Sequence, residues 1–320
     1  MATSEQIKAL VRAHWSDDPE RFRTVALQVA AHEATQGHGI FAHELRAIVD
    51  NALRKEHRAV IVQYPPELQG LVRTEEPGTP LAALVLPNGL TDRIHRVIEE
   101  YVQRDKLRAH GLGPRRKLLL AGLPGTGKTL TARILAHELR LPLSVVQLDM
   151  LVTKFMGESP ARLRQIFDLI ARSPAVYLFD EFDAIGGGRT LGDDVGEMRR
   201  VLNAFLQFIE QDRSDSLIVA ATNSPELLDH ALFRRFDDLL EYPLPGPEER
   251  RRLVSNALGV FLDKRFGFAT VIKASTGLSG AEIVLACCDA MKAAILSDSP
   301  HVAARALEPF LRERHEVRRR

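Results

Sequence analysis

Residues 122–129 read Gly122-Leu123-Pro124-Gly125-Thr126-Gly127-Lys128-Thr129, which fits the phosphate-binding loop pattern G-x-x-x-x-G-K-[ST] in full. In such a loop, backbone N–H groups turn inward around phosphate oxygens. The lysine reaches the β- and γ-phosphates, and the hydroxyl of Thr129 can ligate Mg²⁺. The apolar run 117–121 is typical of a buried strand, and residues 130–139 have helical spacing. A helix N-terminus would then face the phosphates, so we expect the residues from Gly122 to Leu130 to bind a nucleoside triphosphate.

Length, charge and cysteine content bound the class of protein. The 320-residue chain is 45% hydrophobic, which is ample for a core, and its length suggests about two domains. Its net charge of +1 gives no basic field, so neither nucleic acid nor a membrane surface is an expected partner. No apolar run approaches the roughly 18 residues of a membrane span, and no signal-peptide pattern begins the chain. Cys287 and Cys288 are helical neighbours that point about 100° apart and do not pair. These features predict a cytoplasmic protein.

The chain divides into four segments by composition and periodicity. Residues 1–60 have the pattern of three short helices and are expected to form a small helical domain. Residues 61–87 are rich in proline and polar residues, which predicts a linker. Residues 88–245 alternate strands and helices, which implies a parallel sheet with helices on both faces, and residues 246–320 are purely helical, as expected of a lid. The strand candidates are Lys117–Ala121, Leu143–Leu148, Ala175–Phe179, Ser216–Ala221 and Leu239–Tyr242.

Two predicted strands end in residues suited to hydrolysis. Val176–Phe179 is followed by Asp180 and Glu181, and the carboxyl edge of a parallel sheet faces the ligand crevice. Asp180 would hold Mg²⁺, and Glu181 would act as a base that polarises the attacking water. The strand 218–222 is followed by Asn223, whose amide is placed to bond the γ-phosphate or the water. Two ordinary surface acids are the alternative, which the complete phosphate loop disfavours.

Arg234 and Arg235 stand together beside apolar residues. They can be salt-bridged surface groups, or arginine fingers that stabilise the charge on the γ-phosphate as its bond breaks. Because they are far from the phosphate loop in sequence, they would more readily reach the site of a neighbouring subunit than their own.

Together these residues resemble the AAA family of ATPases over residues 85–320. The resemblance identifies residues 122–129 as the Walker A motif, residues 179–186 as Walker B, and Asn223 as sensor 1. It makes Arg234 and Arg235 the finger pair, and places Gly280 and Ala281 of the sensor 2 segment near the nucleotide. It implies a P-loop α/β fold with a helical lid, Mg²⁺-dependent ATP hydrolysis, and a homo-oligomeric ring, usually a hexamer. The similarity extends to the motors of membrane-anchored AAA proteases and of katanin- and spastin-like proteins, but the His-Glu-x-x-His motif of such proteases is missing from the sequence.

Residues 151–159 resemble the first pore loop of the protein-remodelling branch of that family. The expected pore residues are Lys154, Phe155, Met156 and Gly157. An aromatic and an apolar side chain together can grip any threaded polypeptide, although Phe155 could instead pack into the core. The resemblance therefore implies an unfoldase or disassembly motor that a separate protease or effector can partner. Because some members carry three-helix recognition domains of similar size, it also implies that residues 1–60 form a recognition domain that chooses the protein client. A nucleic-acid motor or loader on the same core, and an ATP-sensing switch, are the two alternatives.

Overall fold

The computed structural model describes residues 8, 19–35, 64–65, 68–154, 158–186, 194–227, 230–263 and 265–319. The chain divides into two compact units, residues 1–60 and 61–320. In the first unit, helix α2 (Pro19–Thr35) begins at a proline, a residue that suits a first helical turn. This helix corresponds to the second of the three expected ones. Of the first, only Lys8 is described, as helical, and the third lies outside the described residues.

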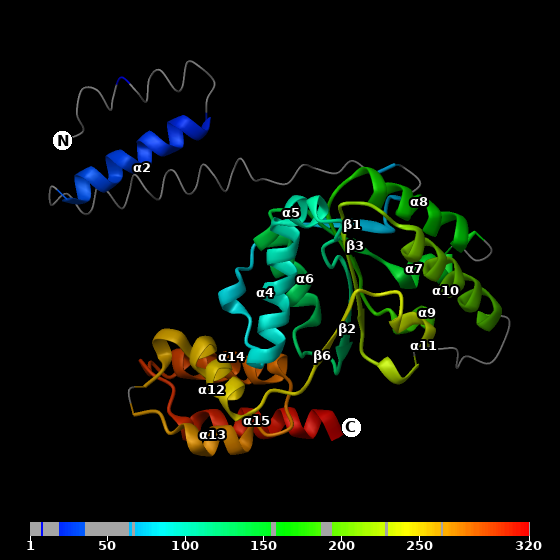
Figure 1. Cartoon of the computed structure of the whole chain (residues 1–320). Helices are drawn as coiled ribbons and strands as arrows, with labels where there is room; N and C mark the ends of the chain where they lie inside the picture. The colour runs from blue at the N-terminus through cyan, green and yellow to red at the C-terminus, as the bar shows by residue number, and fades with distance from the viewer. Residues whose placement is uncertain are drawn as a thin grey trace. The chain divides into compact units, whose positions relative to one another are not determined.

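The second unit is built on a six-stranded sheet of order β1-β3-β4-β5-β2-β6 (Figure 1). Every neighbouring pair is parallel except β1 with β3. Strand β2 lies between β5 and β6, so the loop that follows it leaves from an interior strand of the parallel part of the sheet. The bounds are β1 (Val72–Glu75), β2 (Lys117–Gly122), β3 (Leu143–Val146), β4 (Val176–Phe179), β5 (Leu217–Thr222) and β6 (Asp238–Tyr242).

Helices cover both faces of this sheet, as Figure 1 shows. On one face lie α4 (Asn88–Val102) and α6 (Lys128–Leu139), and Leu118 and Leu120 of β2 pack against them. The other face, to which Leu119 points, packs against α8 (Ser159–Arg172) and α10 (Asp194–Gln211). The alternation follows from the two-residue period of a strand. The smaller elements are η2 (Leu81–Ala83), α5 (Arg104–Ala109), α7 (Leu148–Lys154), α9 (Asp183–Gly186), η3 (Pro225–Leu227) and α11 (His230–Phe233).

The C-terminal residues form a separate helical layer with a core of its own. Val254, Leu258, Ile283 and Leu307 are among the residues buried in it. Cys287 is also buried there, and neither it nor its neighbour forms a disulfide. The elements are α12 (Pro247–Leu258), η4 (Gly259–Phe261), α13 (Phe268–Ala274), α14 (Gly280–Leu296) and α15 (Ala304–Arg319).

The expected α/β fold with a helical C-terminal part is confirmed, but two details of the sequence prediction are wrong. The segment 61–87 is not only a linker, because it contains the edge strand β1, and Leu68, Leu71 and Val72 are buried in the core. The strand expected over Leu143–Leu148 ends at Val146, and Leu148 starts α7 instead. In the part of the chain that the structure describes, no helix is long and apolar enough to cross a membrane.

Candidate active site

The phosphate loop connects β2 to α6 and needs glycine at two positions. A Cβ on Gly122 would lie 2.4 Å from the carbonyl oxygen of Tyr242 on β6. Gly125 has a left-handed backbone with φ of +74°, and its Cβ would lie 2.7 Å from Oγ of Ser279 in the lid. A side chain at Gly122 would therefore clash with the main chain of β6, and one at Gly125 would strain the loop and push against the lid. The tip of the loop, Leu123 to Gly125, is exposed, and Thr126 Oγ1 donates a hydrogen bond to Leu123 O over 2.8 Å.

The ammonium group of Lys128 lies inside the curve of this loop. Its Nζ donates to the carbonyl oxygens of Gly122 and Leu123 over 2.7 and 2.9 Å. Burial lowers the pKa of Lys128, while the nearby carboxylates of Asp180 and Asp183 favour the charged form. A cation at this place can exchange its two carbonyl partners for phosphate oxygens.

Thr129 and Asp180 come together from segments that follow two different strands. Thr129 stands in the first turn of α6 after β2, and Asp180 directly follows β4. The hydroxyl of Thr129 donates to Oδ2 of Asp180 over 2.9 Å. The second carboxylate oxygen of Asp180, Oδ1, accepts the backbone N–H of Glu181 over 3.0 Å. The arrangement puts one hydroxyl and one carboxylate, both oxygen ligands suited to Mg²⁺, at the first turn of α6.

Glu181 is exposed and has an unusual backbone. Its φ is +50°, a left-handed conformation that few residues other than glycine adopt. The next residue, Phe182, donates its N–H to Ala221 O of β5 over 2.8 Å and buries its ring. The chain therefore turns sharply after Asp180 and presents Glu181 at the surface, and strain of this kind is often found at functional sites.

Asn223 directly follows β5, and its backbone is fixed by Asp183, a residue of the Walker B segment for which the sequence predicted no role. Oδ1 of Asp183 accepts the backbone N–H of Asn223 and the hydroxyl of Thr222, both over 3.1 Å. Asp183 is the first residue of α9, three residues after Asp180. That spacing, a second aspartate at a helix start, was the available sequence signal.

The lid touches the phosphate loop at the N-terminus of α14. Ser279 caps this helix and forms a capping box with Glu282. The N–H of Ala281 donates to Gly125 O over 3.0 Å, and a Cβ on Gly280 would lie 3.5 Å from the same oxygen. Gly280 and Ala281 thus lie directly against the loop, and the N-terminus of a 17-residue helix adds positive electrostatic potential there.

Two cavities border elements that carry the site, and one of them has Gly122 in its lining. The other, of about 550 Å³, lies between the η2 segment and the lid, and all of its lining residues except Asn256 are apolar. It is lined by Ala82, Ala83, Val85, Leu253, Asn256, Ala257 and Val284. Leu253 also lies against Gly280, because it is 3.7 Å from where a Cβ on that glycine would be. Sequence reasoning missed this lining, since small apolar residues carry no motif.

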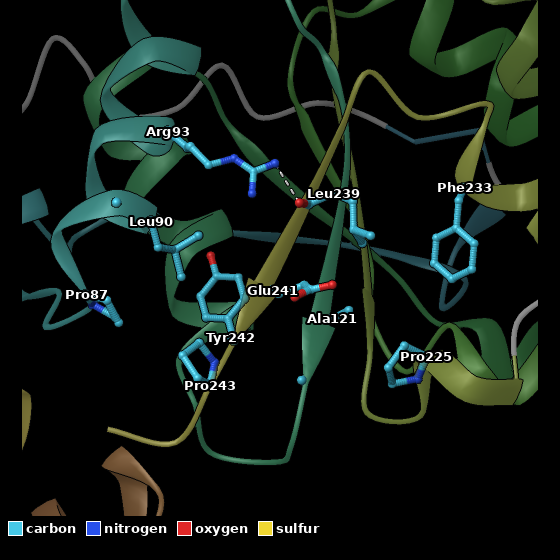
Figure 2. A pocket seen from close by; sticks show the side chains of 12 residues that line it. Pro87, Leu90, Arg93, Ala121, Pro225, Phe233, Leu239, Glu241, Tyr242 and Pro243 are labelled. Atoms are coloured by element: carbon cyan, nitrogen blue, oxygen red, sulfur yellow. Dashed lines mark hydrogen bonds between the residues drawn. The ribbon is translucent and has the colours of Figure 1, made fainter. Parts of the chain in front are cut away.

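The cavity that Gly122 lines, of about 580 Å³, surrounds the end of β6. Figure 2 shows Arg93 and Tyr242 on one side of the β6 ribbon and Phe233 on the other. Arg93 donates to Leu239 O over 2.7 Å. The Tyr242 hydroxyl donates to Thr131 Oγ1 over 2.8 Å, and burial raises its pKa.

The remaining predicted residues lie away from these contacts or outside the described residues. Arg234 is exposed after α11, and Nε of Arg235 lies 3.4 Å from Oε2 of Glu210 on α10. Lys154 ends α7, and Phe155, Met156 and Gly157 lie outside the described residues. The two ends of that segment are joined, because Ser159 Oγ donates to Leu151 O over 3.1 Å.

Residues 118–244 match the family model described as "ATPase family associated with various cellular activities (AAA)". An uncharacterized AAA family ATPase of Sinorhizobium fredii, y4kL, is 32% identical over the whole of this chain and 97% of its own length. A putative 26S proteasome regulatory subunit homolog of Methanothermobacter marburgensis is 34% identical over 68% of this chain and 60% of its own. A proteasome-activating nucleotidase of Methanosphaerula palustris is 32% identical over 77% of this chain and 61% of its own.

Proposed function

Because this chain belongs to the AAA family of ATPases and hydrolyses ATP, we propose that it works as a ring of its own copies that remodels other proteins. The observation that carries the catalytic part is the 2.9 Å contact between Thr129 and Asp180. It joins the phosphate loop to the end of β4, next to Glu181. The phosphate loop and Glu181, the proposed base, therefore lie at the same edge of the sheet.

The nucleotide would lie across the phosphate loop with its base in the 550 Å³ cavity between η2 and the lid. Apolar walls suit the faces of an adenine ring, and Asn256 offers an amide to its edge. Lys128 would leave the carbonyl oxygens of the loop for the β- and γ-phosphates. Ala281 would hold the lid against the loop by its bond to Gly125 O.

Thr129 and Asp180 fit a bound Mg²⁺, because both offer oxygen atoms and they already lie in contact. When bound, the ion neutralises charge on the phosphate oxygens. Glu181 takes the proton of the attacking water as its oxygen bonds the γ-phosphorus, and the bond from that phosphorus to the bridging oxygen of ADP breaks. Asn223 orients the water or the γ-phosphate through its amide.

The placement of Arg234 and Arg235 supports the proposal that the protein forms a ring. Arg234 is exposed, and Arg235, whose own side chain is 33% exposed, forms an ion pair with Glu210, whose side chain is 64% exposed. A surface pair of this kind is held by less than about 1 kcal/mol, so Arg235 can exchange Glu210 for a phosphate of the adjoining copy. We propose that both arginines act there, and that the number of copies is six.

The remodelling activity is proposed from the relatives and from the segment 154–157. The chain spans about 60% of the length of the two proteasome-related relatives described above, so their activity and their partners are proposals for this chain. Phe155 would grip a threaded polypeptide, residues 1–60 would choose the client, and a protease or another effector would receive it.

Two variants test this function. Glu181→Gln keeps the shape of the side chain but removes the base, so it should bind ATP, stall in the assembled state and retain protein clients. Phe155→Ala should keep ATP turnover and lose unfolding of a fluorescent model substrate, while Met150→Ala, exposed on α7, serves as the matched control. Intact unfolding by Phe155→Ala would refute threading. DNA-stimulated turnover that falls steeply with salt would favour a nucleic-acid motor, and slow turnover by a monomer would favour a switch.

A further inference from the structure

We propose that Asp183 is a positioning residue that sets Asn223 for ATP hydrolysis by tying the end of β5 to the turn that carries Glu181. This inference rests on the role proposed above for Asn223. Asp183 itself is not expected to touch the nucleotide. It would act by fixing the main chain from which the Asn223 amide projects.

A single carboxylate oxygen organises the turn after β5. Oδ1 of Asp183 accepts from Thr222 Oγ1 and from the N–H of Asn223. The Thr222 hydroxyl in turn accepts the N–H of Ser224 over 3.1 Å. Thr222 is fully buried, so its hydroxyl has no water to replace these partners. The backbone N–H groups of Asn223 and Ser224 are therefore held by the Asp183 carboxylate, directly for Asn223 and through the Thr222 hydroxyl for Ser224.

The same aspartate belongs to the turn that presents Glu181, the proposed catalytic base. Asp183 begins α9 only two residues after Glu181. The N–H of Ala184, the residue after Asp183, donates to Glu181 O over 2.8 Å, and that of Phe182 donates to Ala221 O over 2.8 Å. The end of β5 is thus connected to the Glu181 turn both by a backbone bond and by the Asp183 side chain. Two such links fix the relative placement of Glu181 and Asn223.

The negative charge of Asp183 strengthens the hydrogen bonds that it accepts, compared with those of a neutral acceptor. Hydrogen bonds to an ionised acceptor are stronger than those between neutral groups. The carboxylate also favours the charged form of Lys128 in the phosphate loop. An asparagine in its place would keep the acceptor oxygen but lose the charge, so the two contributions can be separated by substitution.

The test compares Asp183→Ala, Asp183→Asn and Asn223→Ala in ATP turnover by the full chain. Asp183→Ala should lower kcat by about 10- to 100-fold, the effect of a small misplacement of a reacting group. Its Kd for a fluorescent ATP analogue should stay within about twofold of that of the wild type. Asp183→Asn should recover most of the lost rate. Asp168→Ala, an exposed acid on α8, controls for the loss of a carboxylate.

The double variant decides the inference. If Asp183 acts through Asn223, adding Asp183→Ala to Asn223→Ala should lower kcat little further, whereas independent roles would multiply. If the double variant loses kcat by the product of the two single losses, the inference about Asp183 is wrong, while the proposed role of Asn223 stands. A normal kcat for Asn223→Ala would overturn the proposed role of Asn223 and the inference with it. Should Asp183→Ala fail to fold, Thr222→Val removes one of the two donors. It should lower kcat, and Thr222→Ser should restore it; a wild-type rate for Thr222→Val would count against the inference.

Discussion

Replacing Gly125 by alanine should loosen the lid as well as strain the phosphate loop. The left-handed φ of +74° at this residue costs a side chain about 1–2 kcal/mol. The new Cβ would also lie 2.7 Å from Ser279 Oγ and 3.0 Å from Ala281 Cβ. The N-terminus of α14 must then move away and lose its bond to Gly125 O, which contributes about 0.5–1.5 kcal/mol. We expect the free energy of unfolding to fall by about 1.5–3.5 kcal/mol in all.

Two other glycines separate the strain from the lid contact. Gly111 has a similar φ of +75°, but a Cβ there would meet nothing within 4 Å. Gly111→Ala should therefore lose only the conformational part. A Cβ on Gly113 would also meet nothing within 4 Å, and its backbone lies outside the left-handed region, so Gly113→Ala should change the free energy of unfolding by less than about 0.5 kcal/mol.

The assay is urea unfolding at one protein concentration without nucleotide, followed by titration with a fluorescent ATP analogue. Gly125→Ala should unfold at a lower urea concentration than Gly111→Ala and should bind the analogue more weakly than the wild type. Equal losses for Gly125→Ala and Gly111→Ala, together with normal binding by the former, would refute the argument that the lid rests on this residue.

Two further predictions concern the lid alone. Ser279→Ala removes the cap of α14 and should lower the free energy of unfolding by about 1 kcal/mol. Ser279→Asp should retain most of the stability that the cap contributes. Equal urea midpoints for Ser279→Ala and the wild type would contradict the capping role. Burial raises the pKa of the Cys287 thiol from its ordinary 9.0 to about 12. The folded state therefore holds this proton more tightly, so the stability it contributes is complete below pH 9 and is lost as the pH rises toward 12. A Cys287→Ala variant should lack that part of the alkaline loss in urea titrations; an identical pH profile for the two proteins would disprove it.

The sequence predicted the centre of this fold better than its edges. Strands such as 117–122 and 176–179 are buried on both faces and read as continuous apolar runs. Strand β1 has the sequence Val-Arg-Thr-Glu and lies among prolines, so it shows no such run. It forms because an edge strand needs only one partner and leaves one side in water. Its pairing with β3 is a tertiary contact that no local pattern contains.

The sequence also predicted some residues of the candidate site and missed others. A full phosphate-loop motif and a strand ending in two acids predicted where Thr129 and Asp180 lie, and the structure has their oxygens in contact. The roles of Asn223, Arg234 and Arg235 stay predictions. Asp183 and the apolar cavity beside η2 escaped notice because their significance depends on neighbours more than 30 residues away in sequence. Spacing rules describe one segment at a time and do not record such neighbours.

Tyr242 limits how the C-terminal helices can turn relative to the sheet. It ends β6, its ring is buried, and its hydroxyl is bonded to Thr131, which is bonded to Gly127 O. The connector that follows, residues 243–246, contains two prolines, whose φ angles are fixed by their rings. Rotation about this connector is left with the torsions of Leu244 and Gly246 and the ψ angles of the prolines. Gly246→Pro would remove one of these torsions, whereas Pro245→Gly would add one. The two substitutions therefore offer a means to stiffen or relax this connector without altering the phosphate loop.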